Sequence, residues 1–140
     1  MTHLAQARTL LRVIREDYRT GERLQLGIER KSDGVLLGTC TLFHFMPQNR
    51  RAEIGYMLGH LHWHQGYMNE ALQRLLRYAF EELDLIRIEA DIDPRNEASA
   101  HTLERLGFVK EGYMRERWIV ADVVSDTAVY GLLRREWTAP

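Results

Sequence analysis

The pattern of apolar residues between positions 52 and 92 limits the folds open to this chain more than any other feature. Apolar residues alternate with polar ones over 52–58, recur on one helical face over 67–83, and alternate again over 86–92. A strand, a helix and a second strand in this order form a unit whose two strands are parallel. The chain is therefore expected to contain a sheet with one parallel strand pair, joined by a crossover helix.

Strand-forming runs on both sides of this unit predict further, antiparallel strands. They lie at residues 23–30, 35–45, 108–120 and 127–137. The turn signal Ser32-Asp33-Gly34 joins the first two runs as a hairpin, and Pro47-Gln48-Asn49 turns the chain into the 52–58 strand. Residues 122–126 are expected to connect the last two strands.

Two more segments predict helices. Leu4 to Tyr18 carries apolar residues at helical spacing and should form an amphipathic helix that ends near Thr20-Gly21. Asn96 is expected as the N-cap of a short helix that Gly107 closes. The fold class that follows is α+β (mixed α/β): a mostly antiparallel mixed sheet with one parallel strand–helix–strand unit and helices on both faces.

Length and composition favour a single domain over residues 1–140. Hydrophobic residues make up 45% of the chain, and no Pro/Gly/Ser-rich linker divides it. Its 19 basic and 20 acidic residues give a formal net charge of -1, so no strong field draws it to nucleic acid or to an anionic membrane. No apolar run is long enough for a membrane span or a signal peptide, so a cytoplasmic protein is expected. Cys40 is the only cysteine, which excludes an internal disulfide and a Cys-rich zinc site.

The connection from His62 to Ala71 is the first candidate binding segment. It leads into the N-terminus of the long helix, where unpaired backbone N–H groups and the helix dipole can hold phosphate oxygens. Gly66 would let the backbone approach such a ligand closely. An ordinary strand-to-helix turn explains the segment equally well, and the Gly-Lys-Ser/Thr ending of a Walker loop is absent.

The second candidate segment begins at Asn96. Asn96 and Ser99 have an ordinary explanation as the N-cap and a first-turn residue of the short helix. That helix follows the second parallel strand, just as the phosphate-type turn follows the first. Ligand sites in such units lie beyond the carboxyl ends of the parallel strands, so the two segments are expected at the same end of the sheet.

The alternating histidines His60, His62 and His64 raise the question of a metal site. Alternation in a loop does not bring three imidazoles together, and no carboxylate or cysteine completes a ligand set. No metal site is predicted. His62 and His64 are expected to be loop residues close to a bound ligand.

Three motifs, in a consistent order over residues 52–137, resemble one enzyme family. The sequence Trp63-x-x-Gly66-Tyr67-Met68-x-Glu70-Ala71 is similar to the acyl-CoA pyrophosphate loop of the GNAT N-acetyltransferases. Asn96-x-x-Ser99, followed by Leu106-Gly107-Phe108 and Glu111-Gly112, is similar to that family's second half-site. The ending Asp126…Tyr130-x-Leu132-Leu133…Glu136-Trp137 resembles the branch of RimJ/RimL ribosomal-protein N-terminal acetyltransferases.

The resemblance implies a GNAT-like three-layer fold and direct transfer of an acetyl group from acetyl-CoA, the co-substrate, to a primary amine, with no metal. Backbone N–H groups from His64 to Asn69 would hold the pyrophosphate, and a backbone N–H near Met57 or Leu58 would polarise the acetyl carbonyl. The cofactor-binding residues implied in this way are Tyr56, Met57, Leu58, His64, Gln65, Gly66, Tyr67, Met68, Asn69 and Asn96.

The resemblance also implies a catalytic role for Ser99 as the proton donor to the departing thiolate. Many family members carry a tyrosine seven residues after the asparagine, where this chain has Leu103, so Ser99 takes that role, with Tyr113 next in line. The resemblance begins at the family's second helix. The family's first strand and helix are therefore expected to be missing, which would leave a sheet edge open to another chain, and a homodimer is compatible with this.

Glu53 is the candidate general base. It lies at the start of the strand that would carry the cofactor, on the side opposite Ile54 and Tyr56, and could act through a water. A solvated glutamate at a strand edge is an equal alternative. No dedicated base stands out, which favours an acceptor that needs little help: a peptide α-amine, with a pKa of about 7.7–8.0, rather than a lysine, at about 10.4. The acceptor would be a peptide or protein N-terminus or a small-molecule amine.

Two other functions compete with this one. A CoA-binding but catalytically weak module, with a regulatory or assembly role, would explain the missing tyrosine and the ill-defined base. A nucleotide-phosphate binder would use the same helix start, but no Ser/Thr–Asp pair for Mg²⁺ supports it. Turnover with release of free thiol separates the enzyme from both.

Overall fold

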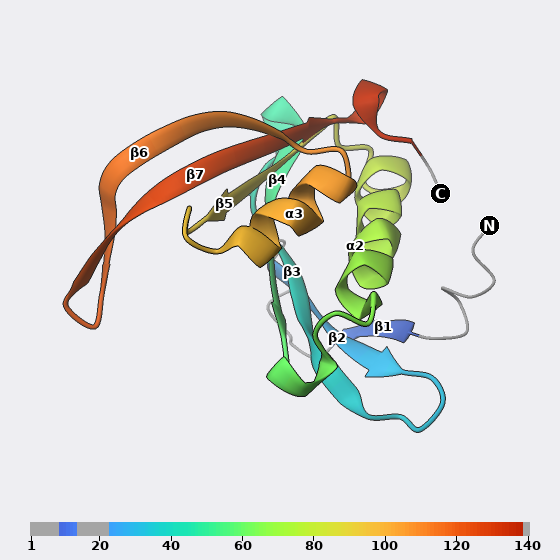
Figure 1. The fold of residues 1–140 in the computed structure, drawn as a ribbon. Coiled ribbons are helices and arrows are strands. Elements are labelled where there is room, and N and C mark those ends of the chain that lie inside the picture. The colour runs from blue at the N-terminus through green and yellow to red at the C-terminus, as the bar shows by residue number, and fades with distance from the viewer. Residues whose placement is uncertain (1–8, 14–22, 139–140) are drawn as a thin grey trace.

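The computed structural model describes residues 9–13 and 23–138 of the chain, and in this part seven strands form one sheet (Figure 1). The strands are β1 (Thr9–Val13), β2 (Arg23–Arg30), β3 (Leu36–Met46), β4 (Arg51–Leu58), β5 (Arg87–Ile92), β6 (Val109–Val120) and β7 (Val123–Leu133). The helices are α2 (Tyr67–Arg77) and α3 (Glu97–Arg105), with a π turn at Tyr78–Glu82 and 3-10 turns at Pro47–Asn49, His60–His62 and Arg134–Glu136. The strand order is β1-β2-β3-β4-β5-β7-β6.

All neighbouring strands are antiparallel except β4 and β5, which are parallel and joined by α2. This confirms the strand–helix–strand unit and the mixed sheet expected from the sequence. The parallel pairing is short, running from Arg51 opposite Arg87 to Glu53 opposite Glu89. Beyond it β4 stays paired with β3 as far as Leu58, and β5 stays paired with β7 as far as Ile92. The sheet therefore splits between β4 and β5.

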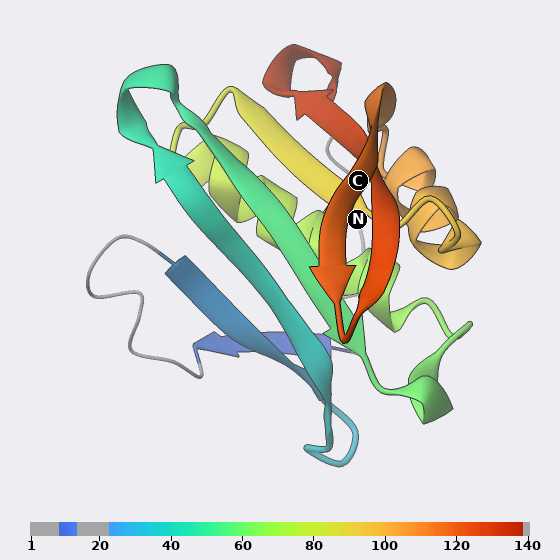
Figure 2. The ribbon, with the colours of Figure 1, turned by 90° about the vertical axis from the view of Figure 1, so that its left-hand side faces the viewer.

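One face of the sheet carries the core. Alternate residues of β2 to β5 and β7 are buried on it, including Ile28, Leu42 and Ile88, each fully buried. The apolar sides of α2 and α3 close over this face, with Leu72 and Leu103 also fully buried. Each such leucine contributes about 1.5–3 kcal/mol when it leaves water. The view in Figure 2 is onto the opposite face of the sheet, with α2 behind it.

The helix expected over Leu4 to Tyr18 is wrong where the structure describes that segment, because Thr9–Val13 is a strand paired antiparallel with β2. The adjacent residues Leu10 and Leu11 fit both the helical spacing of apolar residues and the alternation of a strand. Thr9 and Val13, at the two ends of the segment, are β-branched and favour an extended chain. The rest of that segment, with Thr20-Gly21, lies outside the described residues. Within residues 9–13 and 23–138, both helices pack on the same face of the sheet, and the expected fold class, a mostly antiparallel mixed sheet with one parallel pair, is confirmed.

The ends of two other elements also differ from expectation. Residues 122–126, expected as a connection, belong mostly to β7, and the hairpin turns at Ala121 and Asp122, which have φ values of 50° and 65°. β6 and β7 make a long curved arm in Figure 1. The last strand stops at Leu133 and a 3-10 turn follows. Neither α2 nor α3 is long and apolar enough to cross a membrane.

Candidate functional site

A cavity of about 430 Å³, here called the helix-side cavity, opens between the end of β4, the start of α2 and the start of α3. Its lining is Tyr56, Met57, Leu58, Trp63, His64, Gly66, Tyr67, Met68, Asn69, Asn96, Ala98, Ser99, His101, Thr102 and Arg105. The two candidate segments of the sequence thus meet at one end of the sheet, as expected. Every residue expected to bind the cofactor lines this cavity except Gln65.

The start of α2 offers hydrogen-bond donors to this cavity. Gly66 precedes the helix with a φ of 79° and gives it no side-chain cap. The first backbone N–H groups of a helix have no partner within it, and the helix dipole makes this end positive. The backbone N–H groups of this helix start, which follow a glycine, fit the diphosphate of coenzyme A.

The loop before α2 is tied back to β4. The Trp63 indole Nε1 donates to the Leu58 carbonyl at 2.9 Å. The Gln65 side chain turns away from the cavity and donates to the Leu61 carbonyl at 3.2 Å. Within the segment from His64 to Asn69, Gln65 therefore offers the cavity its backbone and not its side chain.

The start of α3 supplies the second wall. The Asn96 Oδ1 atom accepts a hydrogen bond from the Ser99 backbone N–H at 3.1 Å, so Asn96 is the N-cap that the sequence indicates. The Tyr56 hydroxyl donates to the Ser99 carbonyl at 3.4 Å and so links β4 to α3. Burial raises the pKa of Tyr56, and its phenol stays protonated at neutral pH.

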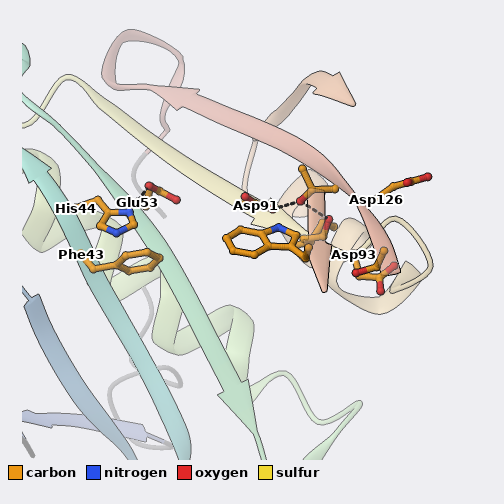
Figure 3. Close-up of a pocket in the computed structure, with 10 residues that line it drawn as sticks. Phe43, His44, Glu53, Asp91, Asp93 and Asp126 are labelled. Carbon is orange, nitrogen blue, oxygen red and sulfur yellow. Dashed lines mark hydrogen bonds and ion pairs between the residues drawn. The ribbon is translucent and has the colours of Figure 1, made fainter. Parts of the chain in front are cut away.

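A second cavity, of about 240 Å³, lies on the other face of the sheet and is here called the strand-side cavity (Figure 3). Its lining is Phe43, His44, Glu53, Asp91, Ile92, Asp93, Trp118, Ser125, Asp126 and Thr127. Glu53 points here and not towards Ser99, because neighbouring β4 residues alternate between the two faces. Glu53 and Ser99, the two expected catalytic residues, thus lie in different cavities.

Four carboxylates reach the strand-side cavity. The pKa of Asp93 is lowered to about 2 because Arg95 donates hydrogen bonds to it from its side chain and its backbone. The pKa of Asp126 is also lowered, because it accepts hydrogen bonds from the Tyr113 hydroxyl and from the Glu116 N–H. Burial raises the pKa of Asp91, which also accepts a hydrogen bond from Thr127. The cavity is therefore negative and favours a cation.

Glu53 has a partner that the sequence analysis did not identify. The His44 Nδ1 atom lies 2.5 Å from Glu53 Oε2. His44 belongs to β3, and Phe43, its neighbour, is directly opposite Glu53 in the β3–β4 ladder. His44 and the aspartates come from separate elements with no common spacing. Only the pairing of β3 with β4 could have pointed to His44.

The two cavities lie on opposite faces of the sheet where β4 and β5 part. Glu53 is the last β4 residue paired with β5, and Tyr56, three residues later, lines the helix-side cavity. Asp91 lies on β5 beyond the end of the same pairing. Ligands in the two cavities would approach each other through the gap between these strands.

Several other candidate residues have structural positions. Leu103 is fully buried on α3, and Tyr113 lines neither cavity because its hydroxyl is directed to Asp126. Cys40 is fully buried, and burial raises the pKa of its thiol to about 12. His60 is exposed and His62 is half-buried in the 3-10 turn before α2, and neither lines a cavity. Within residues 9–13 and 23–138, no three histidine, cysteine or acidic side chains come together as a metal site would need.

Comparison with known proteins gives a consistent family. Residues 1–109 match the family described as "Acetyltransferase (GNAT) domain". The chain is 37% identical over 136 residues to "Uncharacterized N-acetyltransferase p20" of Bacillus licheniformis, covering 97% of this chain and 76% of that protein. It is 29% identical over 129 residues to the ribosomal protein uS5-alanine N-acetyltransferase of Escherichia coli (strain K12), covering 91% of this chain and 66% of that protein.

Comparison with solved structures points to the same family. One described as "Crystal structure of Probable acetyltransferase" superposes with a TM-score of 0.81 at 35% identity, covering 86% of this chain and 67% of that one. The family match and these relatives confirm the resemblance carried by the three motifs. GNAT acetyltransferases generally use acetyl-CoA, and the helix-side cavity has the donors for it. The chain belongs to the GNAT family and is an acetyltransferase.

Proposed function

We propose that residues 1–140 form one acetyltransferase domain that moves an acetyl group from acetyl-CoA to a primary amine, with a peptide or protein N-terminal α-amine as the preferred acceptor. The observation that carries this proposal is the pair of cavities on opposite faces of one gap in the sheet. One cavity offers donors for phosphates and the other offers carboxylates for a cation. Such a division suits a reaction between an anionic co-substrate and a cationic acceptor.

In the helix-side cavity, the backbone N–H groups from His64 to Asn69 would hold the diphosphate of acetyl-CoA. The backbone of residues 56–58 would pair with the pantetheine arm, because this end of β4 has no β5 neighbour to pair with. Asn96 uses its Oδ1 atom for the helix cap, so its Nδ2 group would donate to the same arm.

The reaction needs one nucleophilic step. The amine nitrogen, in its neutral form, bonds to the acetyl carbonyl carbon, and the carbon–sulfur bond breaks with its electron pair on sulfur. Ser99 lines the helix-side cavity. We assign it as the general acid that donates its hydroxyl proton to that sulfur. An acid in such a position contributes about 10²–10⁴-fold to rate.

The acceptor would enter through the strand-side cavity. Carboxylates concentrate a protonated amine there, and the indole of Trp118 adds an aromatic surface for a cation. An α-amine is favoured because about a tenth of it is already neutral at pH 7. The E. coli relative named for alanine acetylation of ribosomal protein uS5 supports the same class of acceptor.

Two measurements test the proposal. Calorimetric titration should give micromolar binding of acetyl-CoA and none of ADP. A peptide with a free N-terminal alanine should then release thiol with this protein, while the same peptide already acetylated should not. Binding of acetyl-CoA without thiol release from any amine would favour the catalytically weak module instead. Equal binding of ADP would favour the nucleotide-phosphate binder.

A further inference from the structure

His44 is held in a conformation that costs energy. The pairing of β3 with β4 is irregular between Phe43 and Met46, and His44 within this bulge has a φ of 51°. Few residues other than glycine adopt a positive φ, although asparagine, aspartate and histidine do so more often than most. Bulges of this kind frequently redirect a side chain beside an active site. Here the bulge turns His44 into the lining of the strand-side cavity.

Two neighbours contact the imidazole, whose side chain is otherwise largely exposed. Its Nδ1 atom lies 2.5 Å from the Glu53 carboxylate, and the edge of the ring meets the Phe43 ring at a centroid distance of 4.7 Å (Figure 3). An ionised carboxylate can only accept a hydrogen bond, so Nδ1 carries the proton in this pair. In the neutral ring, Nε2 then holds a lone pair that can accept a proton.

Four carboxylates line the same cavity as the imidazole. Glu53 comes from β4, Asp91 from β5, Asp93 from the turn after β5 and Asp126 from β7. The other polar residues of the lining, Trp118, Ser125 and Thr127, carry no charge. Three cations act on these aspartates: Arg95 is paired with Asp93, Arg117 acts on Asp91 and Arg115 acts on Asp126. Glu53 is the carboxylate in direct contact with His44.

We propose that His44 is the general base of the acetyl transfer and that Glu53 is its positioning residue. As the amine nitrogen bonds to the acetyl carbonyl carbon and the carbon–sulfur bond breaks, the proton released from the amine passes to Nε2 of His44. Glu53 holds the ring in the tautomer that leaves Nε2 free, and its charge stabilises the imidazolium. This assignment rests on the proposed function, and it moves the base from Glu53 to its partner.

The substitution His44→Asn tests this assignment most sharply. Asparagine tolerates a positive φ and keeps a donor near the Nδ1 position, but it has no atom equivalent to Nε2. We expect kcat for the alanyl peptide to fall by about 100-fold or more, with acetyl-CoA affinity unchanged because the co-substrate occupies the other cavity. The matched control is His60→Asn, at an exposed histidine that lines neither cavity, which should keep kcat within twofold of the wild type.

Chemical rescue and the pH profile separate a base from a structural residue. His44→Gly permits the same backbone φ and leaves space for a free imidazole. Added imidazole should restore part of kcat in this variant and should not raise it in wild-type protein. The acidic limb of the kcat profile should vanish in His44→Asn and remain, displaced, in Glu53→Gln, whose kcat should fall by about tenfold.

The outcomes are distinct. Wild-type protein that releases no thiol with any amine overturns the proposed function, and this inference with it. Active wild-type protein with undiminished kcat in His44→Asn overturns only the assignment of His44. A loss of kcat in His44→Asn with no imidazole rescue of His44→Gly, although both variants still bind acetyl-CoA, also overturns it. A loss of kcat in His44→Asn, imidazole rescue of His44→Gly and an unaffected His60→Asn establish it.

Discussion

In our proposal Asn96 serves the fold and a ligand with different atoms. Its Oδ1 atom caps α3, which leaves the Nδ2 group at the wall of the helix-side cavity. The motif spacing was enough to predict that this residue and Ser99 lie together, because both belong to one short segment. The strand-side residues were not predictable in this way, since His44, Asp91 and Asp126 come from three strands. Their side chains meet only when the sheet has formed.

The two roles of Asn96 can be separated by two substitutions. Asn96→Asp keeps an equally good cap, so unfolding free energy should stay within about 0.5 kcal/mol of wild type. It removes the donor and adds a negative charge, so acetyl-CoA should bind at least tenfold more weakly. Asn96→Ala loses both and should also cost about 1 kcal/mol of stability. Denaturant unfolding and calorimetry measure the two effects, and an unchanged Kd in Asn96→Asp would remove the side chain from the site.

Ser99→Ala isolates the proton donor. The backbone N–H that Asn96 caps remains, so α3 and acetyl-CoA affinity should be preserved. Turnover of the alanyl peptide should fall by about 100-fold if the hydroxyl protonates the leaving thiolate. Thr102→Val, at a second hydroxyl of the same cavity that donates instead to the Ala98 carbonyl, is the control. Normal turnover in Ser99→Ala would mean that another group supplies the proton.

At the scale of whole elements, strand predictions succeeded where a turn signal and alternation agreed. The hairpin around Ser32-Asp33-Gly34 and the β4–α2–β5 unit are examples. They failed where local chemistry and long-range pairing disagreed. Ser125 and Asp126 are typical of loops, yet the ladder with β6 holds this segment extended. Thr9–Val13 lies within a helical pattern, yet it pairs with β2. In both cases backbone pairing with a distant strand outweighs local preference.

The tip of the β6–β7 arm gives a test at this scale. Ala121 and Asp122 both have positive φ, which a type I′ turn requires and which alanine rarely adopts. Replacing the pair with Asn-Gly should raise the free energy of unfolding by about 1 kcal/mol. Thermal unfolding would measure the gain, and the same pair of residues placed at Asp122 and Val123 should destabilise the arm. No gain from the first variant would show that the arm is not part of the cooperative unit.

At the scale of the whole molecule, Cys40 reports on global unfolding. It is fully buried, and burial raises the pKa of its thiol to about 12, because the thiolate is the form that burial disfavours. The neutral thiol therefore contributes stability below its ordinary value of 9.0, and that contribution is lost as the pH rises towards 12. We expect no reaction with a thiol reagent at pH 8 in native protein and one equivalent in denaturant, with Cys40→Ala as the blank. Rapid labelling of the native protein would show that β3 opens locally.

The split between β4 and β5 divides the sheet into two halves that share few backbone hydrogen bonds. β1 to β4 form one continuous ladder, and β5, β7 and β6 form the other, while only the pairs from Arg51–Arg87 to Glu53–Glu89 join them within the sheet. The bonds that resist separation are therefore gathered at one end, where Arg51 of β4 also forms an ion pair with Glu89 of β5 at 3.8 Å. At the other end no backbone pairing joins the two halves. A molecule lodged in that opening would bridge them, and its binding energy would then stiffen the whole domain.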